Sequence, residues 1–277
     1  MLEVSRKKIF VMISFLITIV LVYWGYHQGN IYPSLKTSSV GLEVFYLVSG
    51  CANFLPLYIF FAFLTSNFLS ENFHKNKYNN FKNSIVSRTG YKKRFKSEIQ
   101  LVLVSSFILR VLLSVIILLF IDLFLVNVNI SFSGDITRFP FSFFALNSNS
   151  AVSLIVFIIY SGIGFSIMSL FMYSLIPFIK NLYVYKVSGV LASIIFVMIP
   201  AFIGNIVNNF TGLNSFIRTG FLYIFYSAGL LCPGIEVLNA NPPVLVNHVY
   251  FFTSCFGFLF LSVILLYIGY KKERKNG

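Results

Sequence analysis

The chain has 277 residues, of which 57% are hydrophobic and only 10% are charged. Soluble domains carry about 25% charged residues, so this composition excludes an ordinary soluble protein. Apolar runs of roughly 20 residues recur, which is the length that a helix needs to cross a bilayer. The sequence therefore predicts an all-α, polytopic membrane protein with a single transmembrane domain over residues 1–277.

Six apolar runs predict six transmembrane helices. The first run follows Arg6, Lys7 and Lys8; it is longer than the apolar region of a signal peptide and lacks a small-residue cleavage site, so we expect a retained helix. Pro56 falls within the second run and predicts a kink there. The expected spans are residues 9–26, 43–69, 99–126, 151–176, 187–206 and 249–270.

The Lys and Arg residues are distributed very unequally between the loops. With both termini on one side, the segments on that side hold 17 of the 21 basic residues, the opposite segments hold three, and Arg110 lies within a span. Because loops rich in Lys and Arg stay in the cytoplasm, we expect a multi-pass protein of the cell membrane with both termini cytoplasmic. The net charge of +13 then reflects topology and contact with anionic lipid rather than nucleic-acid binding.

A further apolar stretch, residues 216–232, lies within the outer segment 207–248. It has 17 residues, includes Arg218 and is followed by Pro233 and Gly234, which makes it marginal for a crossing. A crossing there would also put the basic residues of one terminus on the wrong side. We expect a re-entrant or interfacial extracellular helix between the fifth and sixth spans.

The only long polar stretch, residues 71–98, lies between the second and third spans and holds eight of the basic residues. Phe73, Phe81 and Ile85 fall close to one helical face, which indicates an amphipathic helix along the membrane surface, and Gly90 ends it. The alternative is a basic loop that only fixes topology. The stretch is longer than topology requires and it is patterned, which favours the helix.

The order of residues in this stretch resembles the cytoplasmic segment of ABC-2 type transporter permeases. In that family an acidic residue, a helix, a Ser-Arg pair and a basic run precede the third span. The six-span layout and the helical re-entry also resemble the family. The corresponding residues here are Glu71, Ser87, Arg88, Gly90 and the basic cluster Lys92, Lys93, Arg94 and Lys96. The Gly-Thr pair common after the acidic residue is replaced by residues such as Asn76 and Lys77, which leaves the register of the helix open.

The resemblance implies a permease subunit of an ATP-driven exporter, in which residues 71–98 form a coupling helix that docks into a groove of a cytoplasmic ABC ATPase dimer. A second permease chain, identical or related, and membrane lipids would complete the assembly. The resemblance assigns ATPase coupling to Glu71, Phe73, Phe81, Arg88 and Gly90, and contact with the membrane surface to Lys92, Lys93, Arg94 and Lys96.

The sequence contains no phosphate-binding loop of the form G-x-x-x-x-G-K-[ST], so ATP and Mg²⁺ would be bound by the separate ATPase. We expect no catalytic residues, no metal site and no cofactor in this chain, which would be a transport subunit rather than an enzyme. His27, His74 and His248 are expected at the surface or the membrane interface. The many Phe and Tyr residues suit an amphipathic or hydrophobic cargo, such as a peptide, an antibiotic or a lipid-like molecule.

Two ionisable residues fall within the predicted third span. Arg110 lies near mid-membrane, where an Arg costs at least about 2.5–3.5 kcal/mol, so it should face protein or a water-filled cavity. It belongs either to the substrate pathway or a dimer interface, or it is a structural Arg bonded to neighbouring helices. Asp122 lies close to the outer surface, as an interfacial residue.

Two other functions are left open by the sequence. A non-transporting sensor or scaffold would use the basic segment to bind anionic lipid or a regulator. A proton-coupled secondary carrier is weakened, because only Arg110 and Asp122 are available as charges within the spans.

The topology is tested by cysteine accessibility in a cysteine-free background. Ser38→Cys, Asn147→Cys and Asn241→Cys are expected to react with a membrane-impermeant thiol reagent added outside intact cells. Ser84→Cys is expected to react only after the membrane is permeabilised, because it lies in the basic segment. Labelling of Ser84→Cys from outside would overturn the topology.

Overall fold

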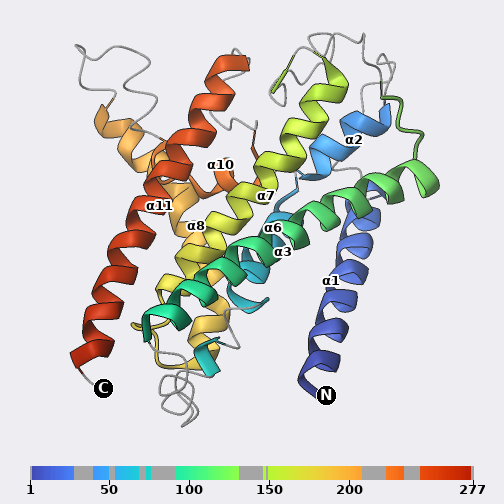
Figure 1. Ribbon diagram of the computed structural model, residues 1–277. Coiled ribbons are helices and arrows are strands. Elements are labelled where there is room, and N and C mark those ends of the chain that lie inside the picture. The colour runs from blue at the N-terminus through green and yellow to red at the C-terminus, as the bar shows by residue number, and fades with distance from the viewer. Residues whose placement is uncertain are drawn as a thin grey trace.

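The computed structural model describes residues 2–27, 40–49, 54–68, 73–75, 91–130, 146–147, 149–207, 223–233 and 244–275. The elements in these ranges are helices, arranged as one bundle (Figure 1). In chain order they are α1 (Leu2–His27), α2 (Val40–Ser49), α3 (Leu55–Asn67), α6 (Tyr91–Phe124), α7 (Ser150–Ser174), α8 (Leu182–Val207), α10 (Ser227–Leu231) and α11 (Val244–Lys275).

Five of these helices, α1, α6, α7, α8 and α11, are long and apolar enough to cross a membrane. The chain is therefore a membrane-embedded, multi-pass helical protein. In Figure 1, α1, α6 and α8 run upward, whereas α3, α7 and α11 run downward. The start of α1 and the end of α11 thus lie at the same end of the bundle, which we call the lower end.

The second predicted span, residues 43–69, is not the single kinked helix that the sequence indicated. The structure divides it into α2, with 10 residues, and α3, with 13 residues. At 1.5 Å per residue they rise about 15 and 20 Å, so neither covers the roughly 30 Å of hydrocarbon alone. Pro56 lies in the first turn of α3, where its missing N–H costs no helical hydrogen bond. The proline therefore begins a helix instead of kinking one.

All five long helices begin earlier than the predicted spans, α6 by the largest margin. α6 has 34 residues, a length of about 51 Å, and begins at Tyr91 rather than near Ile99. The basic residues 92–96, expected as a lead-in to the third span, are therefore helical and continuous with it. α8 begins at Leu182 because Asn181 caps it, its Oδ1 accepting from the backbone N–H of Tyr183 at 2.8 Å.

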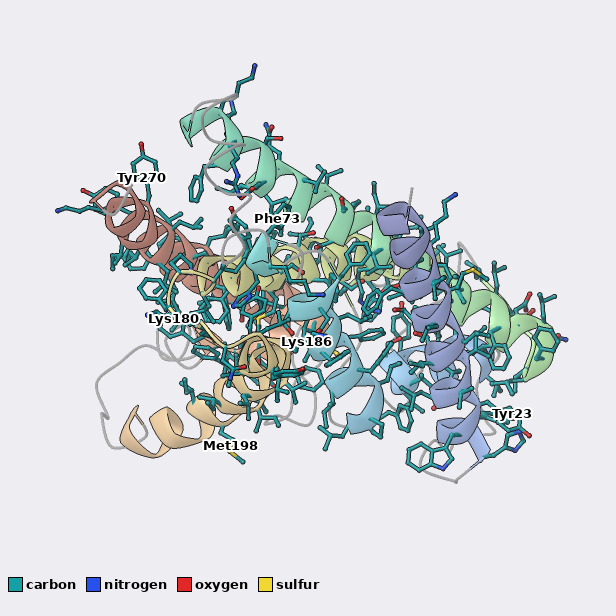
Figure 2. All side chains as sticks on the ribbon, turned by 90° about the horizontal axis from the view of Figure 1, so that it is seen from below. Tyr23, Phe73, Lys180, Lys186, Met198 and Tyr270 are labelled. Carbon is teal, nitrogen blue, oxygen red and sulfur yellow. The ribbon has the colours of Figure 1, made fainter. Side chains whose placement is uncertain are left out.

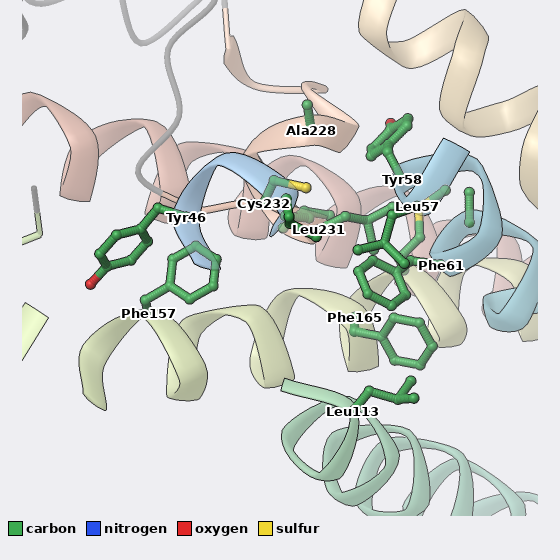
Figure 3. Close-up of a cluster of buried hydrophobic side chains, with 14 of the residues drawn as sticks. Tyr46, Leu57, Tyr58, Phe61, Leu113, Phe157, Phe165, Ala228, Leu231 and Cys232 are labelled. Carbon is green, nitrogen blue, oxygen red and sulfur yellow. The ribbon is translucent and has the colours of Figure 1, made fainter. Parts of the chain in front are cut away.

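α7 is the helix on which most of the others pack. It contacts α3, α6, α10 and α11, and most of its residues are buried. Figure 3 shows Phe61 of α3, Phe165 of α7 and Leu113 of α6 pointing toward one another, and all three are fully buried. Because lipid tails are as apolar as these side chains, close packing rather than removal from water holds the helices together.

Residues 223–233, in the middle of the outer segment, lie inside the bundle. All residues of α10 are buried, and α10 contacts α7, α8 and α11. Gly164 of α7 and Gly257 of α11 allow this approach, because a Cβ atom on either would overlap the backbone carbonyl of Leu230 or of Ile224. The segment enters the bundle rather than lying across its surface.

Hydrogen bonds from small side chains fix this segment. Ser254 of α11 donates to the carbonyl of Tyr223 at 2.8 Å, and Ser227 of α10 donates to the carbonyl of Ser193 in α8 at 2.8 Å. The Tyr58 hydroxyl of α3 lies 2.9 Å from the Ser227 hydroxyl. Three surrounding helices therefore satisfy polar groups that would otherwise be unpaired inside the bundle.

Candidate functional site

The basic segment, residues 71–98, is described only at its two ends, which are called its flanks here and which lie at the lower end of the bundle. Residues 73–75 form a helical turn, and the chain is described again from Tyr91, where α6 begins. Four of the predicted ATPase-coupling residues lie outside the described residues, namely Glu71, Phe81, Arg88 and Gly90; the side chain of Lys92 is likewise not described. The site is built here from the two flanks of the segment.

Both flanks pack against one group of buried side chains, the lower cluster. The ring of Phe73 lies 5.5 Å from the ring of Tyr173, and the ring of Phe95 lies 6.2 Å from it. Figure 2 looks onto this end of the bundle, with Phe73, Lys180 and Tyr270 labelled. The lower cluster consists of Val102, Leu170, Tyr173, Ile176, Tyr185 and Leu266.

His74 fastens the first flank to the connection between α7 and α8. Its Nε2 atom lies 2.7 Å from the carbonyl oxygen of Ile179, and its ring stacks on Tyr185 with 4.9 Å between the ring centroids. The Tyr185 hydroxyl in turn donates to the carbonyl of Met172 at 3.0 Å. His74 is only 2% exposed, so the surface position expected from the sequence is wrong for this histidine.

The second flank consists of the first turns of α6, and interactions of the Glu98 carboxylate hold it in place. Arg94 donates through Nε to Oε1 of Glu98 at 2.7 Å, and the Tyr173 hydroxyl donates to Oε2 of the same carboxylate at 2.6 Å. Glu98 therefore connects α6 to α7. Lys93 and Lys96 are exposed on the same turns, in position to meet headgroups or a partner.

Arg110 lies in the middle of the bundle and is 0% exposed. Its Cζ atom is 3.8 Å from the centroid of the Phe61 ring, and Nη2 donates to the carbonyl of Leu231, at the end of α10, at 3.3 Å. Its Nε and Nη1 atoms have no hydrogen-bond partner among the described residues. An aromatic face and one carbonyl compensate a buried positive charge only in part.

The structure does not bring Asp122 and Arg110 together. They lie 12 residues apart on α6, about 18 Å along the helix. The Asp122 side chain is exposed and accepts a hydrogen bond from the backbone N–H of Val128 at 2.7 Å. This bond pairs a backbone N–H group just beyond the end of α6.

Glu43 is a buried acidic residue that the sequence analysis missed among the charges within the spans. It lies in α2 and is 3% exposed. It is the first residue of the predicted second span. The burial arises because α2 packs against α1, α3 and α6, and no local pattern signals such contacts.

Comparisons with protein-family models, with curated proteins and with solved structures found no match. Among the described residues, no group of three or more His, Cys, Asp or Glu side chains is placed to hold a metal ion. The candidate site consists of two features of the structure: the flanks of the basic segment, which pack against the lower cluster, and the buried Arg110.

We expect Tyr173→Phe to loosen the first turns of α6. The change removes the hydroxyl that donates to Glu98, and a hydrogen bond to a charged group contributes about 1.5–3 kcal/mol. The midpoint of thermal unfolding in detergent should fall, and protease should cut the basic segment faster. Tyr183→Phe, at an exposed position on α8, is the matched control and should leave both measurements unchanged. Equal behaviour of the two variants would show that the Tyr173–Glu98 bond does not hold this end of α6.

Proposed function

We propose that this chain is the permease subunit of an ATP-driven exporter of the ABC-2 type. In this proposal α2 and α3 together make the second of six crossings, and the lower end of the bundle faces the cytoplasm. The proposal rests on one observation above all: both flanks of the basic segment are attached to the lower cluster.

A loop that only fixed topology would need no such attachment. Phe73 and His74 attach the first flank to Tyr173 and to the α7–α8 connection, and Glu98 attaches the second flank to Tyr173. A displacement of the basic segment would therefore move the lower ends of α6, α7 and α8 together. That is the mechanical property required of a segment that receives force from an ATPase.

The separate ATPase dimer would bind ATP and Mg²⁺, and the contacts with it would be made by Glu71, Phe81 and Arg88. Phe73 has a different part in this proposal, because its ring packs against the chain's own Tyr173. A second permease chain would complete a path for an amphipathic or hydrophobic cargo.

The second candidate function is a membrane sensor or scaffold without transport activity. It is favoured by the exposure of Lys93 and Lys96 at the lower end, where they suit contact with anionic headgroups or a regulator.

Co-purification with an ABC ATPase encoded beside this chain separates the two functions. Truncating one partner of a buried charge pair costs roughly 2–5 kcal/mol, so Glu71→Ala and Arg88→Ala should each reduce the recovered ATPase at least about tenfold. Lys93→Ala removes an exposed charge from the same region and should have little effect.

The sensor or scaffold function predicts the reverse order. Removing Lys92, Lys93 and Arg94 together would then have the largest effect, on binding to vesicles that contain anionic lipid. Full recovery of the ATPase by a variant carrying both Glu71→Ala and Arg88→Ala, with transport intact, would exclude these residues as the coupling contact.

A further inference from the structure

Arg110 carries a buried positive charge without an acidic partner among the described residues. Glu98 and Asp122 stand on the same helix, but each is 12 residues away, about 18 Å along α6. Both are already engaged, Glu98 with Arg94 and Asp122 with a backbone N–H. No described carboxylate forms an ion pair with the Arg110 guanidinium, and its only hydrogen bond to a described residue is to the Leu231 carbonyl.

The bond to Leu231 leaves most of this guanidinium unsatisfied. At 3.3 Å it is longer than the usual 2.7–3.2 Å, and it occupies only Nη2. The Phe61 ring covers one face of the guanidinium but accepts no conventional hydrogen bond from Nε or Nη1. A charge left uncompensated inside a protein is strongly destabilising, so the position calls for a further acceptor.

The guanidinium lacks hydrogen-bond acceptors for Nε and Nη1, and it lacks a neutralising negative charge. These two needs determine the chemistry of the acceptor. A water molecule inside the bundle would accept from Nε or Nη1 but would not neutralise the charge. An anion does both, and the planar fork of an Arg fits a carboxylate or a phosphate with paired hydrogen bonds. Phe61, which covers the guanidinium, lies beside Phe165 and Leu113 in Figure 3, and these apolar side chains suit the hydrocarbon part of an amphiphile.

We propose that Arg110 is an anion-binding site in the middle of the bundle and that it receives the carboxylate or phosphate head group of an acidic amphiphile. Nη1 and the second hydrogen of Nη2, which lie side by side at the end of the guanidinium, donate to the head-group oxygens, and Phe61 fixes the plane of the guanidinium. This proposal rests on the exporter function proposed above and specifies the charge of its cargo.

The test uses the purified full-length chain in a neutral detergent, dodecyl maltoside, and measures the midpoint of thermal unfolding. The probe is dodecyl phosphate; dodecyltrimethylammonium supplies the same tail with a positive head group, and inorganic phosphate supplies the anion without a tail. Dodecyl phosphate should raise the midpoint by roughly 5–10 °C at a hundredfold excess over its Kd. Neither of the other two probes should produce this shift.

Arg110→Met removes the charge and keeps an unbranched but shorter side chain. Without probe it should unfold at the same temperature as the wild type or higher, because it replaces an uncompensated charge with an apolar group. With dodecyl phosphate it should show no shift. Lys96→Met removes one charge from an exposed position of the same helix and should keep the full shift.

Several results would overturn the proposal. They are no shift in the wild type, a full shift retained by Arg110→Met, or a shift with inorganic phosphate alone, which would assign the site to a free anion. If Arg110→Met does not fold, Arg110 is tested as Arg110→Gln, and a full shift in that variant overturns the proposal equally. No ATPase is present in these measurements, so their failure is distinguishable from failure of the co-purification test.

Discussion

Hydrocarbon offers no hydrogen-bond partner, so each polar group of this chain must be satisfied within the helices that surround it. Several of its buried serines meet this constraint within their own helices. Ser166, Ser174 and Ser262 donate to carbonyls three or four residues earlier in their own helices, at 2.8, 2.6 and 2.6 Å. Such small hydroxyl side chains let the helices approach closely while their own hydrogen bonds are made. Arg110 carries the largest deficit, because a full charge stands in the bundle with one long hydrogen bond to a described residue.

The two features of the candidate site are connected by the chain itself. α3 carries Phe61 and leads down to the basic segment, and α6 leads away from that segment and carries Arg110. Arg94, in the first turns of α6, lies 16 residues from Arg110, about 24 Å along one continuous helix. Asn67, at the lower end of α3, donates to the carbonyl of Lys186 in α8 at 2.9 Å. A displacement of the basic segment would therefore reach α6, which carries Arg110, and α3, whose Phe61 covers the guanidinium.

The sequence predicted what depends on local pattern. Long apolar runs led to the correct all-helical, multi-pass architecture, since a helix satisfies its own backbone in lipid. The kink predicted at Pro56 was wrong because the residue begins α3, and the start of α6 at Tyr91 was missed because the basic residues there were read as a lead-in. The burial of Glu43, His74 and residues 223–233 depends on contacts between distant parts of the chain. The close approach at Gly164 likewise could not be predicted from the sequence, because it depends on α10 packing against α7.

The most direct test of a connection between the basic segment and Arg110 is the ATP hydrolysis rate of the purified permease–ATPase assembly in nanodiscs. If a head group at Arg110 is sensed through α3 and α6, dodecyl phosphate should change the wild-type rate, whereas dodecyltrimethylammonium at the same concentration should not. The response should be lost in Arg110→Gln and kept in Tyr183→Phe. Equal hydrolysis rates of the wild-type assembly with dodecyl phosphate and with dodecyltrimethylammonium would contradict this account.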